Sequence, residues 1–220
     1  MTERIFHELV DAFPKLLLPA IKVTIPLTLL SFSIGLLIAL TTALVQVAKI
    51  PVLRKAARFY VWIIRCTPMI VQLFVVYFGL PSIGIRLASF PAAVLVFSIS
   101  VGAYCSETIR AAIESVSSGQ MDAAYCSGFT FSQAMFHIII PQACSTAFPP
   151  LSNSLIGLVK DTSLAYSVAL VEILASAQRI AARTYDYFWL YLEAAVVYLI
   201  ICSILTVLQR RGEKALEARR

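Results

Sequence analysis

Charged residues are scarce in this sequence, and the motif that would let it bind a nucleotide is missing. Only 14% of the 220 residues are charged, whereas 60% are hydrophobic. Since a soluble domain cannot bury so much apolar surface, the composition excludes that class and favours helices that face lipid. None of the eight glycines is followed by lysine. The sequence therefore lacks the glycine-rich loop and lysine that cradle ATP phosphates, and this chain cannot bind ATP in that manner.

Metal and dithiol chemistry also find no support. The five cysteines are dispersed without a Cys-x-x-Cys pair, and His7 and His137 have no partner at metal-ligand spacing. Residues 1–22 mix acids and bases instead of placing a basic start before a short apolar core, which predicts no cleavable signal peptide. The net charge of +6 comes from basic residues beside apolar runs. We therefore expect no metal, no nucleic-acid partner and one membrane domain over residues 1–220.

Long apolar runs predict an all-α integral membrane protein. The uncharged runs at residues 23–48, 66–85 and 87–106 each exceed the ~18 residues that mark a spanning helix. Weaker runs add two more candidates near the C-terminus. We predict five transmembrane helices, at residues 19–47, 59–79, 91–115, 144–159 and 187–208. We expect Pro149 and Pro150 to interrupt the fourth, because proline lacks the backbone N–H that a helix uses.

The distribution of basic residues predicts the orientation of the chain. The connection at residues 49–58 carries Lys49, Arg54, Lys55 and Arg58 without an acid, which places it in the cytoplasm by the positive-inside rule. The N-terminus then lies outside and the C-terminus is cytoplasmic. The basic C-terminal tail agrees with this, since it contains Arg210, Arg211, Lys214, Arg219 and Arg220. For residues 160–187 we predict a partly re-entrant piece and a short helix.

The stretch at residues 118–141 predicts two short helices outside the membrane. Gly128 would end the first, because glycine tolerates the left-handed turn. Thr130 would open the second, since Thr130 and Gln133 have the spacing of a capping box. Pro141 would break that second helix. The result is a cytoplasmic helix–Gly–helix loop, here called the coupling loop, with a face of small residues formed by Ala123, Ala124 and Gly128.

The coupling loop carries a resemblance to a known family. Asp122-Ala123-Ala124, then Gly128, then Ile138-Ile139-Ile140-Pro141 is similar to the EAA loop of the membrane subunits of ABC importers. Asp122 stands where the family has Glu, and Ile140 where it has Leu. The resemblance implies that the loop docks into a cleft on a separate ATPase subunit and transmits its movements. The residues it assigns to ATPase coupling are Asp122, Ala123, Ala124, Gly128 and Pro141.

Charged residues within spans are costly and are candidates for function. Glu107 and Arg110 lie three residues apart on the third predicted span and can pair on one helix face. Lys160 and Asp161 end the fourth. A zwitterionic solute needs an anionic and a cationic partner in one cavity, so Lys160 or Arg110 could face a carboxylate, and Glu107 or Asp161 an ammonium group. Alternatively, these pairs neutralise each other and lock the bundle.

Two further segments resemble importer permeases for polar amino acids. Residues 65–72, Arg-Cys-Thr-Pro-Met-Ile-Val-Gln, are similar to their Arg-Gly-Thr-Pro-x-x-x-Gln stretch, with Cys66 in place of Gly. Residues 153–164 are similar to their Asn-Ser-(apolar)-Lys-Asp-Thr-Ser-Leu segment. The resemblance covers residues 24–211 and is nearest to cystine permeases. It implies a type I ABC importer permease fold with a substrate path at Lys160, Asp161, Thr162, Ser163, Glu107, Arg110 and Gln72.

The resemblance also implies a function and partners. The chain would be the permease subunit of an ATP-driven importer for polar amino acids, L-cystine among them, in the bacterial plasma (inner) membrane. It would be no enzyme and carry no cofactor, because partner ATPase subunits would bind ATP and Mg. Its other partners would be a second permease copy, an extracellular or periplasmic solute-binding protein and the lipid bilayer. The alternative is an ion-coupled carrier or channel acting without an ATPase; a membrane enzyme lacks a nucleophile–base arrangement.

Overall fold

The computed structural model describes residues 2–47 and 50–217, and within these ranges every regular element is helical. The predicted all-α fold is confirmed. Lys49, Arg219 and Arg220, which contribute to the predicted orientation, lie outside the described residues. The α-helices are α1 Thr2–Pro19, α2 Ile25–Val47, α3 Pro51–Arg65, α4 Met69–Phe74, α5 Ser89–Glu114, α6 Ser118–Cys126, α7 Phe131–Ala134, α8 Ile140–Asp161, α9 Ile173–Thr184 and α10 Tyr187–Glu217.

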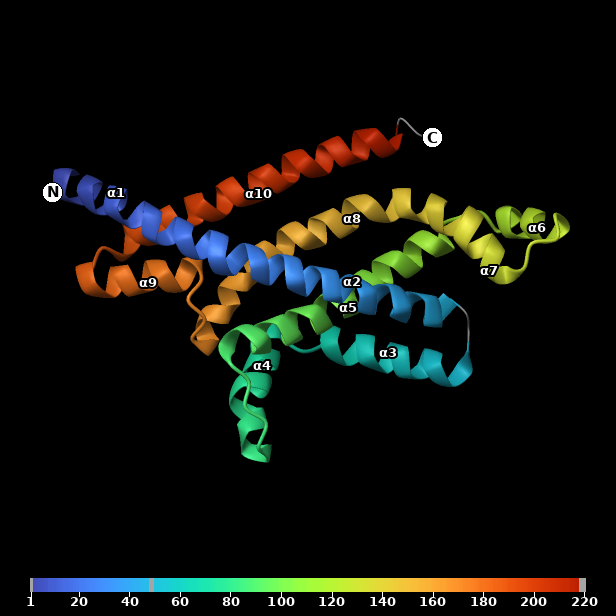
Figure 1. Ribbon diagram of the computed structural model, residues 1–220, viewed down its shortest axis with the longest axis horizontal. Helices are drawn as coiled ribbons and strands as arrows, with labels where there is room; N and C mark the ends of the chain where they lie inside the picture. Colours follow the sequence, from blue (N-terminus) through green and yellow to red (C-terminus); the bar gives the residue numbers. More distant parts are fainter. Residues whose placement is uncertain (1, 48–49, 218–220) are drawn as a thin grey trace.

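The first two helices form one long rod (Figure 1). A π-helical turn at Ala20–Thr24 joins α1 to α2 without a break, so that a helix of 45 residues runs over Glu3–Val47. At about 1.5 Å per residue it is more than twice as long as the ~30 Å hydrocarbon core. The predicted span at 19–47 is therefore part of a longer helix, and α1 must extend past the bilayer or run along it.

Only some predicted spans are single helices. Glu3–Val47, Ser89–Glu114 and Tyr187–Leu216 are long and apolar enough to cross a membrane. Two bent helix pairs supply the rest, with a bend of 100° between Pro51–Arg65 and Met69–Ile83 and of 51° between Phe131–Val168 and Ile173–Thr184. The described chain thus has three candidate spans, or up to five if each bent pair is one span.

The second span predicted at residues 59–79 is not a single helix, because the chain bends by 100° between Pro51–Arg65 and Met69–Ile83. Pro68 adopts an extended conformation (ψ 135°) ahead of α4, and a proline disfavours helical geometry in the residue before it. The Gln72 amide nitrogen donates to Ile64 O at 3.0 Å and to Thr67 O at 3.2 Å. These bonds satisfy carbonyls that the end of α3 leaves open. The segment Val75–Ile83 then projects away from the bundle as further short helical turns (Figure 1).

Helix α5 lies at the centre of the bundle and packs closely on α2. A Cβ atom added to Gly35 would come within 2.5 Å of Val101 Cγ1, and one added to Gly102 within 2.6 Å of Ile38 Cγ2. Membrane helices commonly approach one another through such small residues. The Tyr60 hydroxyl also donates to Ile99 O at 2.6 Å and ties α3 to α5.

The prolines of residues 131–161 do not break the helix, contrary to both expectations. A π-helical turn at Met135–Ile139 connects α7 to α8, and Pro141 lies in the first turn of α8. In that wider turn the Ile140 N–H bonds to Met135 O, so the backbone adapts before the proline is reached. Pro149 and Pro150 lie inside α8, which continues to Asp161. Membrane helices tolerate internal prolines when neighbouring groups satisfy the freed backbone.

The expected short helix after residue 160 is confirmed as α9, and a buried carboxylate holds its start. A 3-10 helix, Thr162–Val168, precedes it. Glu172 is fully buried and accepts hydrogen bonds from the backbone N–H groups of Leu174 (2.8 Å) and Ala175 (2.7 Å). The Tyr198 hydroxyl of α10 donates to the same carboxylate at 2.5 Å. Glu172 thus caps α9 and links it to α10.

Candidate functional site

The coupling loop folds as its local sequence predicts. Gly128 adopts the left-handed conformation at φ 83°. Its N–H donates a hydrogen bond to Tyr125 O at 3.0 Å, and the Phe129 N–H donates one to Ala124 O at 3.0 Å. This pair of hydrogen bonds defines a Schellman C-cap. Thr130 and Gln133 form both bonds of a capping box at the start of α7. The helix end and the helix start are therefore confirmed.

The loop lies at one extremity of the molecule, where α6 and α7 stand beyond the adjoining ends of α5 and α8 (Figure 1). Asp122, Ala123, Gly128 and Pro141 are exposed. Ala124, which we expected on the same small-residue face, is only 2% exposed and faces inward instead. A partner protein can therefore contact Ala123 and Gly128 directly, while Ala124 supports them from beneath.

A largely apolar hollow, here called the aspartate hollow, opens between α4, α5 and α8. Its volume is about 260 Å³. Asp161 is the one charged group among its described lining residues, and Ser100 and Ser154 add hydroxyls. The full lining is Met69, Ser100, Val101, Tyr104, Cys105, Ser154, Gly157, Leu158 and Asp161. The hollow therefore offers an anionic group in a largely apolar wall.

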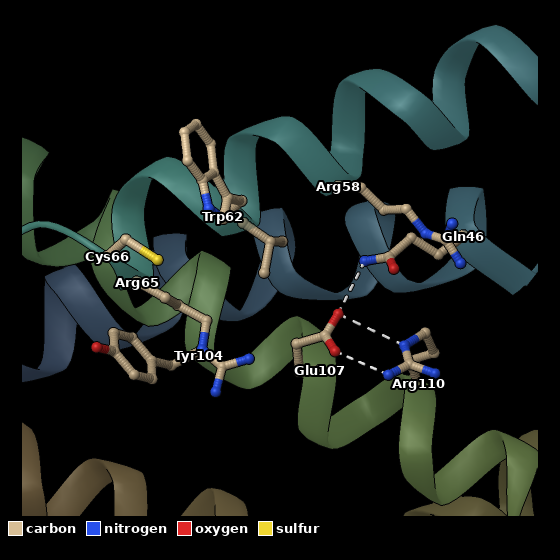
Figure 2. A pocket seen from close by; sticks show the side chains of 9 residues that line it. Gln46, Arg58, Trp62, Arg65, Cys66, Tyr104, Glu107 and Arg110 are labelled. Carbon is tan, nitrogen blue, oxygen red and sulfur yellow. Dashed lines mark hydrogen bonds and ion pairs between the residues drawn. The ribbon is translucent and has the colours of Figure 1, made fainter.

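A second and larger hollow, here called the arginine hollow, has a volume of about 480 Å³. It is lined by Gln46, Arg58, Val61, Trp62, Arg65, Cys66, Tyr104, Glu107 and Arg110, which come from α2, α3, α5 and the turn after α3 (Figure 2). Glu107 accepts from Arg110 Nη2 at 2.8 Å and from Gln46 Nε2 at 3.2 Å. Arg110 also contacts Glu114 at 2.6 Å. The predicted Glu107–Arg110 pair is thus present and extends to a third charged group.

The two hollows follow one another along α5. Tyr104 lines both of them. Ser100 and Val101 precede it in the aspartate hollow, and Glu107 and Arg110 follow it in the arginine hollow. Since α5 ends at Glu114 and α6 begins at Ser118, the arginine hollow lies on the coupling-loop side. Tyr104 therefore forms part of the wall of both hollows.

The remaining predicted path residues lie elsewhere. Lys160 is exposed and is not part of either lining. Thr162 is fully buried and donates its hydroxyl to Val159 O at 2.6 Å, and Ser163 is half-buried in the same 3-10 helix. Gln72 is engaged at the bend after α3, where it also donates to Thr67 Oγ1 at 2.8 Å. The structure gives Thr162 and Gln72 local structural bonds, so Asp161, Glu107 and Arg110 are the predicted residues that line cavities.

Sequence reasoning missed two lining residues of the arginine hollow, Arg65 and Gln46. From the sequence, Arg65 is named only as part of the segment at residues 65–72 and is assigned no role in a cavity. In the structure its guanidinium carbon lies 5.3 Å from the centre of the Tyr104 ring. Gln46 was hidden in an apolar run, yet it is 4% exposed and bonds to Glu107. Its polar amide within the otherwise apolar run at residues 23–48 is the feature that could have marked Gln46 as a lining residue. Within residues 2–47 and 50–217, no group of three or more His, Cys, Asp or Glu residues is placed to hold a metal ion.

Long apolar helices that enclose hollows with charged lining residues indicate a membrane protein that handles a polar solute or ion. The sequence profile of one family matches residues 31–217. The chain belongs to this family, the binding-protein-dependent transport system inner membrane components.

Individual relatives agree with this assignment. The L-cystine transport system permease protein TcyB of Bacillus subtilis (strain 168) is 45% identical over 208 residues, which are 94% of this chain and 89% of the relative. A crystal structure of an amino acid ABC transporter with histidines contains a chain that is 33% identical, with a TM-score of 0.88 over 94% of this chain and 96% of that one. A chain of the MetNI methionine ABC transporter is 18% identical, with a TM-score of 0.72 over 98% and 99% of the two chains. The ABC importer permease fold is therefore confirmed.

Proposed function

We propose that this chain is the permease subunit of an ATP-driven importer for polar amino acids and that L-cystine is its substrate. The observation that carries this proposal is the 45% identity with an L-cystine permease over 94% of the chain. The two hollows support it, because a permease for a zwitterion needs both anionic and cationic groups along its path. Asp161, Glu107, Arg65 and Arg58 supply both kinds of group.

In this proposal the coupling loop transmits the work of the ATPase. Asp122, Ala123 and Gly128 dock into a cleft of a separate ATPase subunit, which binds ATP and Mg. The exposure of these residues supports this role. The short Asp122 side chain reaches less far than the Glu of the family pattern, so docking relies on close contact with Ala123 and Gly128. Movement of the loop can pass into α8, because α7 continues into it through the π-helical turn Met135–Ile139, and into α5 through the short connection at residues 115–117.

Two copies of the chain and two ATPase subunits would form the importer. A solute-binding protein outside the bacterial inner membrane would deliver the amino acid, and the coupling loop and the C-terminus would lie in the cytoplasm. The five-span topology follows if each bent helix pair counts as one span. An ion-coupled carrier acting alone is a weaker explanation, because the family consists of components of binding-protein-dependent systems.

The test is uptake by the reconstituted complex. The chain, its ATPase and its binding protein are placed in vesicles, and uptake of labelled L-cystine is measured with and without ATP. We expect ATP-dependent uptake that unlabelled cystine suppresses more strongly than glutamine, histidine or arginine. Uptake driven by a sodium or proton gradient without the ATPase would instead support the carrier. Stronger competition by another amino acid would reassign the substrate.

A further inference from the structure

The structure changes which residues can receive the carboxylate of a solute. Arg110 was a candidate, but its guanidinium is already bound by Glu107 at 2.8 Å and by Glu114 at 2.6 Å. Lys160, the other candidate, is exposed and lines neither hollow. An amino acid inside the arginine hollow therefore needs a different cationic partner.

Arg65 has the position and the freedom for this task. It lies at the end of α3, lines the arginine hollow and points between Tyr104 and Glu107 (Figure 2). Its guanidinium carbon is 5.3 Å from the Tyr104 ring centre, a contact that orients the planar group without occupying its N–H donors. In the described part of the chain it makes no direct ion pair, although it attracts Glu107 across the hollow. A guanidinium held in this way can bind a carboxylate with two parallel hydrogen bonds.

The arginine hollow carries an excess of positive charge, which favours binding of an anionic group of a solute. The described lining contains three arginines, Arg58, Arg65 and Arg110, and one carboxylate, Glu107. Even when Glu114 is added because it binds Arg110, one positive charge stays in excess. The volume of about 480 Å³ lies within the ~300–1,000 Å³ of small-molecule sites. Glu107 remains close by to attract the ammonium group of the same solute.

We propose that the arginine hollow is a second solute station, in which Arg65 binds the α-carboxylate of the amino acid after it leaves the aspartate hollow. This inference rests on the proposed function and deepens it. In the aspartate hollow Asp161 attracts the ammonium end, whereas in the arginine hollow Arg65 attracts the carboxylate end. A solute that passes Tyr104 thus exchanges one charged partner for the other on its way toward the coupling loop.

Cys66 provides a reporter for occupancy, since its exposed thiol lines the arginine hollow next to Arg65. The complete complex is embedded in lipid nanodiscs with Cys126, Cys144 and Cys202 replaced by serine and the buried Cys105 retained. Labelling of Cys66 by a maleimide is measured against the concentration of L-cystathionine, a thioether analogue of cystine that cannot exchange with thiols. A companion protein that retains Cys144 instead of Cys66 reports on an exposed thiol that lines neither hollow.

We expect L-cystathionine to protect Cys66 but not Cys144, and its dimethyl ester to protect neither. Arg65→Gln should raise the concentration for half-protection about 10- to 100-fold, since a hydrogen-bonded ion contact is lost. Arg65→Lys should fall between, because a lysine keeps the charge but not the planar fork. Arg86→Gln, which changes an exposed arginine outside both hollows, is the matched control and should match the parent.

The outcomes separate this inference from the proposed function. Absence of protection, equal protection by the ester, or an Arg65→Gln protein that behaves like the parent would overturn the arginine station. ATP-driven uptake of L-cystine is measured with the same proteins reconstituted in closed vesicles. Uptake by the parent complex together with any of those results removes this inference only. If the parent complex shows carboxylate-dependent protection of Cys66 but never imports cystine, the Arg65 site is supported and the proposed function is wrong.

Discussion

The coupling loop and the arginine hollow show two ways in which this chain builds a site. The bonds that shape the loop between α6 and α7 join residues at most five positions apart, such as Phe129 to Ala124 and Thr130 to Gln133. The arginine hollow gathers Gln46, Arg65 and Glu107 from three helices, and its Gln46–Glu107 bond joins residues 61 positions apart. Local bonds therefore shape the turn between α6 and α7, although Met135 and Ile139 also share a buried cluster with Ala112 and Ile113 of α5. Long-range contacts, in contrast, assemble the arginine hollow.

The largest effect should come from Gly128→Val. Its left-handed conformation at φ 83° disfavours a branched side chain by about 1–3 kcal/mol, yet an added Cβ would meet nothing within 4 Å. We expect ATP-driven uptake and association with the ATPase to be abolished, because the new side chain blocks the docking surface. Gly84→Val is the matched control, since Gly84 has φ 87° and equally open surroundings. Equal uptake by the two variants, measured in vesicles, would show that the loop is no docking site.

The second prediction concerns the buried contact at the start of α9. Glu172→Ala removes the acceptor of two backbone N–H groups and of the Tyr198 hydroxyl. Since each buried group left without a partner costs about 1–3 kcal/mol, we expect destabilisation of roughly 3 kcal/mol or more. Tyr198→Phe should cost less, because the other two bonds stay. The measurement is the midpoint of thermal unfolding in detergent.

Tyr185→Phe is the control for that measurement, because Tyr185 is 79% exposed. If the Glu172→Ala and Tyr185→Phe proteins have the same midpoint of thermal unfolding, the α9–α10 contact adds nothing to stability. Long-range contacts would then not be what stabilises the α9–α10 end of the bundle.

The same contrast explains what the sequence could predict. Gly128, Thr130 and Gln133 were placed correctly because glycine C-caps and capping boxes depend on neighbouring residues alone. The long apolar helices Ser89–Glu114 and Tyr187–Leu216 were also recognisable, since length and composition suffice. These elements fix the fold class and the position of the coupling loop.

The features that the sequence did not predict depend on contacts between residues of different helices or on local backbone adjustments. Pro141 was expected to end a helix, but the π-helical turn before it lets the helix continue to Asp161. The bend at Pro68 depends on how Gln72 bonds back to α3, which no periodicity reveals. Arg65 lines a cavity because that bend ends α3 beside Tyr104 on α5. Such placements need the packed bundle, so the sequence alone could not show that Arg65 lines a cavity.

Gln72→Glu tests that bend and should have the third-largest effect. A carboxylate cannot donate to Ile64 O or Thr67 O, which Gln72 now bonds at 3.0 and 3.2 Å. We expect a loss of about 1–3 kcal/mol in stability. Faster hydrogen exchange should follow in α3 and α4, with α6 and α7 unchanged. Gln178→Glu introduces the same charge at an exposed position of α9 and should leave exchange near the bend unaltered. If the two variants exchange alike, the Gln72 amide does not fix the bend.

The smallest effect should come from Thr130→Ala at the start of α7. It removes the hydroxyl that accepts from the Gln133 N–H at 3.4 Å and leaves the Thr130 N–H bond to Gln133 Oε1 at 2.9 Å. Loss of an N-cap costs about 0.5–2 kcal/mol, so we expect faster hydrogen exchange within α7 but no change in α5. Thr130→Ser keeps the hydroxyl and should match the parent. Because the cap is exposed and local, the midpoint of global unfolding should stay nearly constant. A clear drop in that midpoint would mean that the coupling loop unfolds together with the rest of the bundle.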